Sequence, residues 1–418
     1  MRSSGEQSLC GRFGKFQSPV SDEKDRRRAP RLWPLYLAGF VTAFGANGIA
    51  AAVGGEHERL GLTLGWLGVF LALYDVSELV LKPVFGALSD RIGPKPVILG
   101  GLVLFLLASV AGVFATGPTW LGLVRLAQGA GASAFSPASS AAVARLATPG
   151  TRGRYFGRYG SWKSLGYAGG PVAGAVIVAF AGTGWLFGLL SVMAAVTAAA
   201  VWIVVAPIHP LPRERATIAA LARSVTRPGF LIPVAVLALG SAAIGSLTGM
   251  LPALATGLGI PLVVSAVAVA VIAVTSSILQ PFVGRAHDSG RLRVRLACGL
   301  GTIIVAAGCG VLALFPSAPA LFVAAVLVGT GVALLTPVAF SHLASTTPEA
   351  RLGRTMRSAE LGREAGDAAG PLIVGGVGAA ASLPAGFGVF ALIAALVAFS
   401  AATGLRQKGD TASTPAEG

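Results

Sequence analysis

Long runs of apolar residues, broken by short polar or charged stretches, dominate the pattern along this chain. A helix needs about 20 apolar residues to cross a bilayer, and the runs reach that length. The pattern predicts twelve membrane-spanning helices, at 32–54, 66–88, 97–116, 119–146, 162–182, 184–205, 229–255, 259–284, 293–315, 318–343, 357–382 and 385–405. We therefore expect an all-α membrane protein whose helices leave no room for a soluble domain.

The composition agrees with this interpretation and excludes several other classes of protein. Hydrophobic residues make up 54% and charged residues 12% of the 418 residues, whereas a soluble domain carries about 25% charged residues. Such hydrophobicity excludes a disordered chain, and three cysteines are too few for a disulfide scaffold. The first apolar run follows a charged stretch of 31 residues and is too long for a cleaved signal peptide.

The net charge of +15 is distributed unevenly between the two sets of connections. Connections after odd-numbered spans contain one cation, Arg59, whereas the other connections and both tails are rich in arginine and lysine. Cytoplasmic loops carry the excess of basic residues in membrane proteins. We therefore predict a multi-pass protein of the cytoplasmic (inner) membrane with both termini in the cytoplasm, and we interpret the charge as a topology signal rather than a nucleic-acid surface.

Three short stretches recur in order at an offset of 198 to 200 residues, which indicates a duplicated six-helix unit. They are residues 81–83 against 279–281, 129–131 against 329–331, and 163–171 against 363–371. Parallel repeats of this kind place a transporter's substrate site between them, near the bilayer midplane. The predicted parts are a cytoplasmic tail (1–31), two six-helix bundles (32–205 and 229–405), a cytoplasmic linker with an amphipathic helix (206–228) and a second tail (406–418).

The connection between the second and third spans reads Gly-Ala-Leu-Ser-Asp-Arg-Ile-Gly-Pro-Lys at residues 86–95. Taken alone, Asp90 could simply cap the third helix, since a carboxylate suits a helix N-terminus. The string also resembles the signature loop of the major facilitator superfamily, except that Pro94 replaces a usual basic residue. The resemblance implies two pseudo-symmetric six-helix bundles and a charged cytoplasmic gate, whose expected members are Gly86, Asp90, Arg91, Gly93, Lys95, Asp288, Glu360, Arg363 and Glu364.

Two further strings resemble elements of the same superfamily. Residues 125–132 look like the R-x-x-Q-G-x-G-A element associated with proton coupling, although Arg125 could instead snorkel to the outer surface. Residues 166–174 resemble the G-x-x-x-G-P-x-x-G element of drug–proton antiporters, although close helix packing alone would also explain them. The residues expected to let helices pack and rock are Gly129, Gly131, Gly166, Gly170, Pro171, Gly174, Gly370 and Pro371.

Charged residues inside the spans are the candidates for proton coupling or substrate recognition, because such charges mark ion and substrate paths. The first span has no acidic residue, although many exporters of the superfamily place one there. In the second span Asp75, Glu78 and Lys82 share a helix face about 60° wide. Glu78 and Lys82 stand at i,i+4 and can neutralise each other, which leaves Asp75 as the better proton carrier; pairing of Asp75 with Lys82 or Arg125 is the alternative. Asp367, the deepest charge of the eleventh span, is the second candidate.

The sequence contains no motif for a metal, a cofactor or a catalytic centre. His342 stands alone, Cys298 and Cys309 have no histidine nearby, and Walker, nucleophile-elbow and H-E-x-x-H strings do not occur. We therefore expect a secondary active transporter rather than an enzyme, acting without a cofactor, as a monomer, by alternating access. Its expected partners are protons, a small-molecule substrate and the lipid bilayer, with no nucleic acid.

The resemblance and the charges inside the spans favour proton-coupled export of a small amphipathic or cationic compound. Proton-coupled uptake of a sugar or organic acid is the first alternative, since Arg125 and Lys82 could hold an anionic substrate. A lipid flippase or a transporter-like sensor is a weaker alternative, based on the basic face and the amphipathic linker, which would suit anionic lipids.

Overall fold

The structure is a computed structural model that describes residues 31–56, 64–115, 117–148, 150–208 and 228–404. It divides into two units, residues 1–31 and 32–418, and the second unit contains every helix described below. The predicted tails and residues 209–227 of the predicted linker, where its amphipathic helix was expected, lie outside the described residues.

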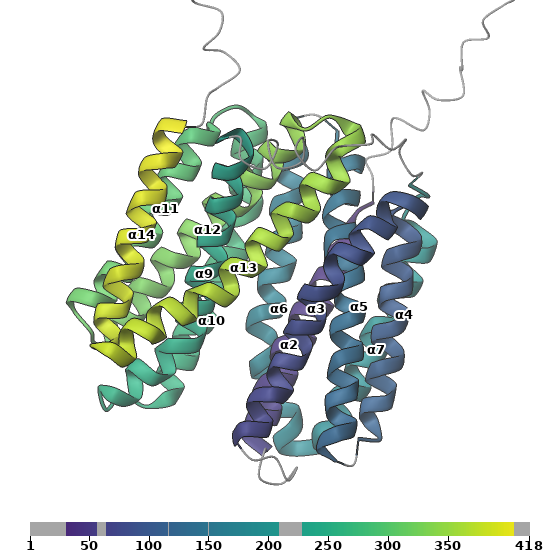
Figure 1. The fold of residues 1–418 in the computed structure, drawn as a ribbon, viewed down its shortest axis with the longest axis horizontal. Helices are drawn as coiled ribbons and strands as arrows, with labels where there is room; N and C mark the ends of the chain where they lie inside the picture. The colour runs from purple at the N-terminus through teal and green to yellow at the C-terminus, as the bar shows by residue number, and fades with distance from the viewer. Residues whose placement is uncertain (1–30, 57–63, 116, 149, 209–227, 405–418) are drawn as a thin grey trace, which may run out of the picture. The chain divides into compact units, whose positions relative to one another are not determined.

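The described residues form twelve α-helices and one short 3-10 helix, with no strand among them (Figure 1). The helices are α2 (Trp33–Glu56), α3 (Leu64–Ile92), α4 (Pro94–Val113), α5 (Pro118–Leu146), α6 (Arg152–Ala181), α7 (Thr183–Val204), α9 (Pro228–Gly257), α10 (Leu262–Asp288), α11 (Val294–Leu314), α12 (Ala318–Thr346), η1 (Glu349–Arg351), α13 (Leu352–Ala380) and α14 (Leu383–Gly404). The predicted all-α fold class with twelve helices is confirmed. Within the described residues, seven helices are long and apolar enough to span a membrane: α4, α7, α9, α10, α11, α12 and α14.

Proline and glycine set several of the helix boundaries. α4 begins at Pro94, directly after Gly93, whose φ of 92° lies in the region that glycine adopts without strain. Gly182, with a φ of 88°, separates α6 from α7. α6 begins at Arg152, ten residues before the span predicted at 162, because its first turns are basic and polar and extend the helix beyond the apolar run.

Helix pairings in the first half have counterparts in the second half. α2 packs along α6 as α9 packs along α13, and α3 packs on α5 as α10 packs on α12. α4 packs on α5 and α7 as α11 packs on α12 and α14. The two halves therefore share one internal arrangement, as expected of a duplicated six-helix unit.

Small residues let several of these helix pairs approach backbone to backbone. A Cβ atom on Gly170 of α6 would meet the backbone of Gly48 in α2, and one on Gly370 of α13 would meet the backbone of Ala242 in α9. Such close approach is the packing that small residues permit between membrane helices. The same kind of backbone approach is made by Gly129, Gly131, Gly166 and Gly174, while Pro171 and Pro371 lie inside α6 and α13.

The two halves meet mainly through α6 and α10, with smaller contacts of α13 with α3 and α5, and of α6 with α12. We call the end that carries the connections α3–α4, α5–α6, α10–α11 and α12–α13 the basic end. Between this end and mid-depth, the Ser161 hydroxyl donates to the Ser277 backbone oxygen at 2.5 Å, and the Ser277 hydroxyl donates to the Ser161 oxygen at 3.1 Å. The two serine hydrogen bonds therefore join the halves on the basic side. In the described part of the chain, α2 and α9 make at most isolated contacts with each other.

Candidate functional site

Three cations from three helices lie at one depth in the bundle. Lys82 is ten residues before the end of α3, and Lys163 and Arg363 are each eleven residues after the starts of α6 and α13. A helix rises 1.5 Å per residue, so all three lie about 15 to 17 Å from the basic end of their helices. This depth is about half of a hydrocarbon core roughly 30 Å thick.

These cations belong to a charge network that crosses between the halves. Lys82 Nζ lies 2.6 Å from Glu78 Oε1 in its own helix and 3.0 Å from Glu364 Oε1 in α13. Arg363 in turn contacts Glu364 at 2.5 Å and Glu360 at 3.1 Å. The side chains of Lys82 and Glu360 are each 1% exposed, so both charges depend on these partners. The network therefore joins α3 to α13 at mid-depth.

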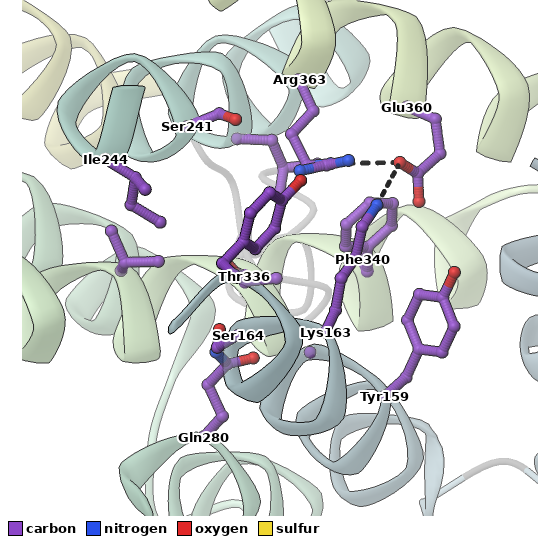
Figure 2. Close-up of a pocket in the computed structure, with 14 residues that line it drawn as sticks. Tyr159, Lys163, Ser164, Ser241, Ile244, Gln280, Thr336, Phe340, Glu360 and Arg363 are labelled. Atoms are coloured by element: carbon purple, nitrogen blue, oxygen red, sulfur yellow. Dashed lines mark hydrogen bonds and ion pairs between the residues drawn. The ribbon is translucent and has the colours of Figure 1, made fainter. Parts of the chain in front are cut away.

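Glu360 ends this network and is held by groups from both halves. Its Oε1 accepts a hydrogen bond of 2.5 Å from the Ser140 hydroxyl of α5. Its Oε2 accepts one of 3.1 Å from Nε of Arg363. Lys163 Nζ lies 4.0 Å from the same Oε2, which is an ion pair but too long for a hydrogen bond (Figure 2).

A cavity that is partly open to solvent lies beside this group, between α6 of the first half and α9, α10, α12 and α13 of the second (Figure 2). Its charged lining consists of Lys163, Glu360 and Arg363. Small-molecule sites are usually lined mostly by apolar and aromatic side chains, with a few placed polar groups. The apolar and aromatic lining here fits that description: Tyr159, Tyr167, Leu237, Ile244, Val332 and Phe340.

Asp75 and Asp367, the two predicted proton carriers, lie farther from the basic end than the network, at about 23 to 26 Å by helix rise. Asp75 is exposed at the surface of the folded chain. Asp367 is half-buried and packs against Gly245 of α9. The described ion pairs include neither of them, and Asp75 lies within electrostatic range of Asp367 across the halves. Lys82, considered as a partner for Asp75, pairs with two glutamates instead.

Arg125 is buried in the first half, with 2% of its surface exposed. Its guanidinium carbon lies 4.3 Å from the centre of the Tyr74 ring in α3, and its Nη2 donates to the backbone oxygen of Ala46 in α2 at 3.4 Å. Gln128 of the same sequence element donates to the Ser109 hydroxyl in α4 at 3.0 Å. These side chains connect α5 to its neighbours. The alternative expectation was that Arg125 extends to the outer surface, whereas in the structure its side chain is buried among α2, α3 and α5.

At the basic end, Asp90 of α3 forms an ion pair with Arg357 of α13, with 3.1 Å between nitrogen and oxygen. The Arg357 side chain also packs over Gly86. Arg91 is exposed, and Lys95 donates to two backbone oxygens at the end of α7. Three other expected gate residues lie about 12 to 18 Å inside α13 and belong to the deeper network: Glu360, Arg363 and Glu364.

Asp288, the counterpart of Asp90 in the second copy, caps a helix of the opposite half. Its two carboxylate oxygens accept hydrogen bonds from the backbone N–H groups of Gly153 and Arg154, each at 2.7 Å. The first N–H groups of a helix lack partners inside the helix, and its N-terminus favours negative charge. The end of α10 is thereby fastened to the start of α6.

Replacing Asp288 with alanine should loosen this joint by about 1 to 2 kcal/mol, the usual cost of a lost N-terminal cap. The amide protons of Gly153 and Arg154 should then exchange about 5- to 30-fold faster. Hydrogen–deuterium exchange of the peptide covering residues 150–156 measures this change. Asp288→Asn keeps one carbonyl acceptor and should show a smaller increase, whereas unchanged exchange in Asp288→Ala would contradict the cap.

Sequence reasoning missed Lys163 and Arg357 as site residues. The sequence offers one signal for Lys163, because the repeat matches it with Arg363 at an offset of 200. Arg357 has no comparable signal, since it is one of many basic residues near the connections. Within the described part of the chain, no three His, Cys, Asp or Glu side chains gather in a way that could hold a metal ion.

Known proteins resemble this chain in sequence over part of its length and in fold over most of it. A family model described as the Major Facilitator Superfamily matches residues 35–312. The multidrug resistance protein MdtG of Enterobacter lignolyticus is 33% identical over 112 residues, which cover 27% of each chain. The matched segments span about a quarter to a third of the length of such curated relatives.

Two solved structures share the fold over nearly the whole chain. The human organic anion transporter MFSD10 superposes with a TM-score of 0.77 at 18% identity, covering 88% of this chain and 98% of that chain. The major facilitator transporter FucP, solved in the outward conformation, superposes with a TM-score of 0.76 at 15% identity, covering 90% of this chain and 99% of that chain. At these identities the likeness concerns the fold alone.

Proposed function

The chain belongs to the major facilitator superfamily, whose members are membrane transporters and not enzymes, and we propose that it exports a small amphipathic compound in exchange for protons. In this proposal the substrate binds in the cavity between the halves. The two halves rock about that cavity, so that it opens alternately to the two sides of the membrane.

The observation that carries the proposal is the placement of two acidic side chains, one on each half, beside a charge network that spans both. Asp75 of α3 and Asp367 of α13 have no described ion-pair partner. A charged group in the bilayer is costly unless it is paired or hydrated, and such groups mark proton relays in transporters. A carboxylate without a cation partner is therefore free to gain a proton on one side of the membrane and lose it on the other.

Contacts between the halves support an outward-facing state. The halves are joined between the basic end and mid-depth, and the positive-inside rule assigns the basic end to the cytoplasm. The same rule favours both termini in the cytoplasm, and we propose that the chain lies in the cytoplasmic membrane. The FucP structure, which has the same fold, is in an outward conformation. We further propose that the monomer is the functional unit, because both halves of the cavity come from one chain.

Export is favoured by two independent features. The Gly-Pro stretch at 166–174 packs α6 against α2 through glycine, as in the element that resembles drug–proton antiporters. Curated relatives that match part of the chain are named multidrug resistance proteins, in Enterobacter lignolyticus and in Bacillus subtilis. The first of these features lies in the first half of the molecule, which also holds Asp75.

Proton-coupled uptake of an organic anion is the second candidate. The observation favouring it is the pair of cations, Lys163 and Arg363, that line the cavity. The human protein that shares the fold is named an organic anion transporter. Uptake and export use the same cavity and differ in the direction in which the proton gradient drives the substrate.

The test is expression in an efflux-deficient bacterium, with growth measured on a broad panel of compounds against an empty-vector control. Export predicts resistance to some compounds and lower accumulation of those compounds in cells. Addition of a protonophore should restore accumulation, because it removes the driving force. Accumulation of labelled organic acids above the vector control would favour uptake, and a well-expressed, membrane-inserted protein that gives no resistance would contradict export.

A further inference from the structure

We propose that the cavity selects small amphipathic organic anions and that the Lys163 ammonium is the group that holds their negative charge. This inference rests on the proposed function only in assuming that the cavity is the substrate site of the transporter. It goes beyond it by choosing an anion over a neutral or cationic compound for either direction of transport, and by assigning the binding of its charge to one side chain.

The charges that a ligand in the cavity can reach are mainly positive. Glu360 is the only carboxylate that lines the cavity in the described part of the chain, and its side chain is 1% exposed. Both of its oxygens are occupied, one by the Ser140 hydroxyl and the other by Arg363. The side chains of Lys163 and Arg363 are 13% and 11% exposed. A ligand in the cavity therefore meets positive charge, while the one negative charge is covered.

The two cations of the cavity differ in how many of their hydrogen-bond donors are already used. The Arg363 guanidinium is engaged by Glu360, by Glu364 and by the Tyr167 hydroxyl. Lys163 lies 4.0 Å from Glu360 and has no described hydrogen bond, although an ammonium group carries three donors. A donor at mid-depth in the bilayer is expensive to leave unpaired. A carboxylate or sulfonate in the cavity would accept its hydrogen bonds.

The repeat explains why two cations meet here. Lys163 of α6 and Arg363 of α13 are the matching positions of the two copies, so the pseudo-symmetry brings them to the same depth on opposite halves. Glu360 has no acidic counterpart in the first copy, where Gly160 stands at the offset of 200. The two copies together therefore supply two cations and one anion to the cavity, which leaves a net positive charge for the ligand.

The remaining lining fits the apolar part of such a ligand. Leu237 and Ile244 of α9 and Phe340 of α12 line the cavity from the second half, while Tyr159 and Tyr167 of α6 line it from the first. Figure 2 shows Ile244, Phe340 and Tyr159 around it. An aromatic carboxylate combines this apolar body with the charge that Lys163 binds.

The experiment compares three probes with the same ring and different charge: 2-naphthoate, 2-naphthylmethanol and 2-naphthylmethylammonium. Binding to the full chain in nanodiscs of zwitterionic lipid is measured by calorimetric titration at neutral pH, with empty nanodiscs subtracted. The proposal predicts that 2-naphthoate binds about 10- to 100-fold more tightly than either other probe, as expected for a charge-assisted hydrogen bond. Equal binding of the three, tighter binding of the ammonium or no binding of the naphthoate would overturn it.

Variants then assign the charge to Lys163. Lys163→Gln should weaken naphthoate binding by about 10- to 100-fold and leave naphthylmethanol binding nearly unchanged, since only the charged contact is lost. Lys163→Arg keeps the charge and should retain most of the affinity. Arg291→Gln removes an exposed cation in the α10–α11 connection and should bind naphthoate like the wild type. Wild-type affinity in Lys163→Gln would overturn the role of Lys163.

The outcome is separable from that of the proposed export. Anion binding without resistance or exclusion in cells would contradict export and leave the anion site intact. Resistance limited to cationic compounds, with the ammonium probe bound most tightly, would support export and overturn the anion site.

Discussion

Replacing Lys82 with methionine should lower the free energy of unfolding by about 3 to 5 kcal/mol and abolish transport, because it breaks a buried ion network by removing one partner. Lys82 is fully buried in α3 and holds Glu78 at 2.6 Å and Glu364 at 3.0 Å. Methionine fills a similar volume, so the loss is one of charge rather than of packing. The two glutamates would then repel each other without a cation between them.

Thermal or chemical denaturation of the detergent-solubilised protein measures the change in stability. Lys82→Arg keeps the charge and should lie close to the wild type. The triple variant Glu78→Gln, Lys82→Met, Glu364→Gln removes the charges together and should recover much of the stability, since a neutral, well-packed replacement of a buried ion network is often tolerated. A Lys82→Met protein as stable as the wild type would show that the network contributes little to folding.

Much of the fold could be predicted from the sequence, because an apolar run that crosses a membrane must satisfy its backbone hydrogen bonds internally and therefore forms a helix. The twelve predicted runs correspond to twelve helices, and most boundaries agree within a few residues. The start of α6 was the largest error, since Arg152 to Ser161 form a polar, basic helical extension that hydropathy alone does not assign. A search for long apolar runs does not detect such a segment, whose few buried apolar residues, Tyr155, Phe156 and Tyr159, stand among polar ones.

The candidate site was less predictable because its partners come from different helices. The Glu78–Lys82 pair follows from i,i+4 spacing on one helix. Lys82 with Glu364 joins helices 282 residues apart, and no spacing rule relates them. The hydrogen bond from the Ser140 hydroxyl to Glu360 could not be predicted either, because serine in a helix usually forms a hydrogen bond with its own backbone. The repeat, which matches Lys163 with Arg363, is the one sequence signal that relates site residues of the two halves.

Replacing Asp75 with asparagine should uncouple substrate movement from proton movement. Asparagine has nearly the shape of the protonated carboxylic acid but cannot release a proton, so the variant should bind substrate and fail to carry the proton. Substrate-driven proton flux should therefore fall to near the level of protein-free liposomes. Proteoliposomes with a trapped pH-sensitive dye measure this flux, while exchange of labelled for unlabelled substrate should persist.

Matched variants decide which carboxylate carries the proton. Asp75→Glu keeps a titratable group and should retain part of the flux, and Glu349→Gln, at an exposed carboxylate of the basic end, should match the wild type. Asp367→Asn is expected to reduce the flux less than Asp75→Asn, because Asp367 packs against Gly245 while Asp75 is exposed. Full coupling in Asp75→Asn with loss of coupling in Asp367→Asn would move the proton site to α13, on the half that also carries Arg363. The proton would then lie about one turn from Arg363, a cation that lines the cavity, on the same helix, and protonation there would change the charge that the substrate meets.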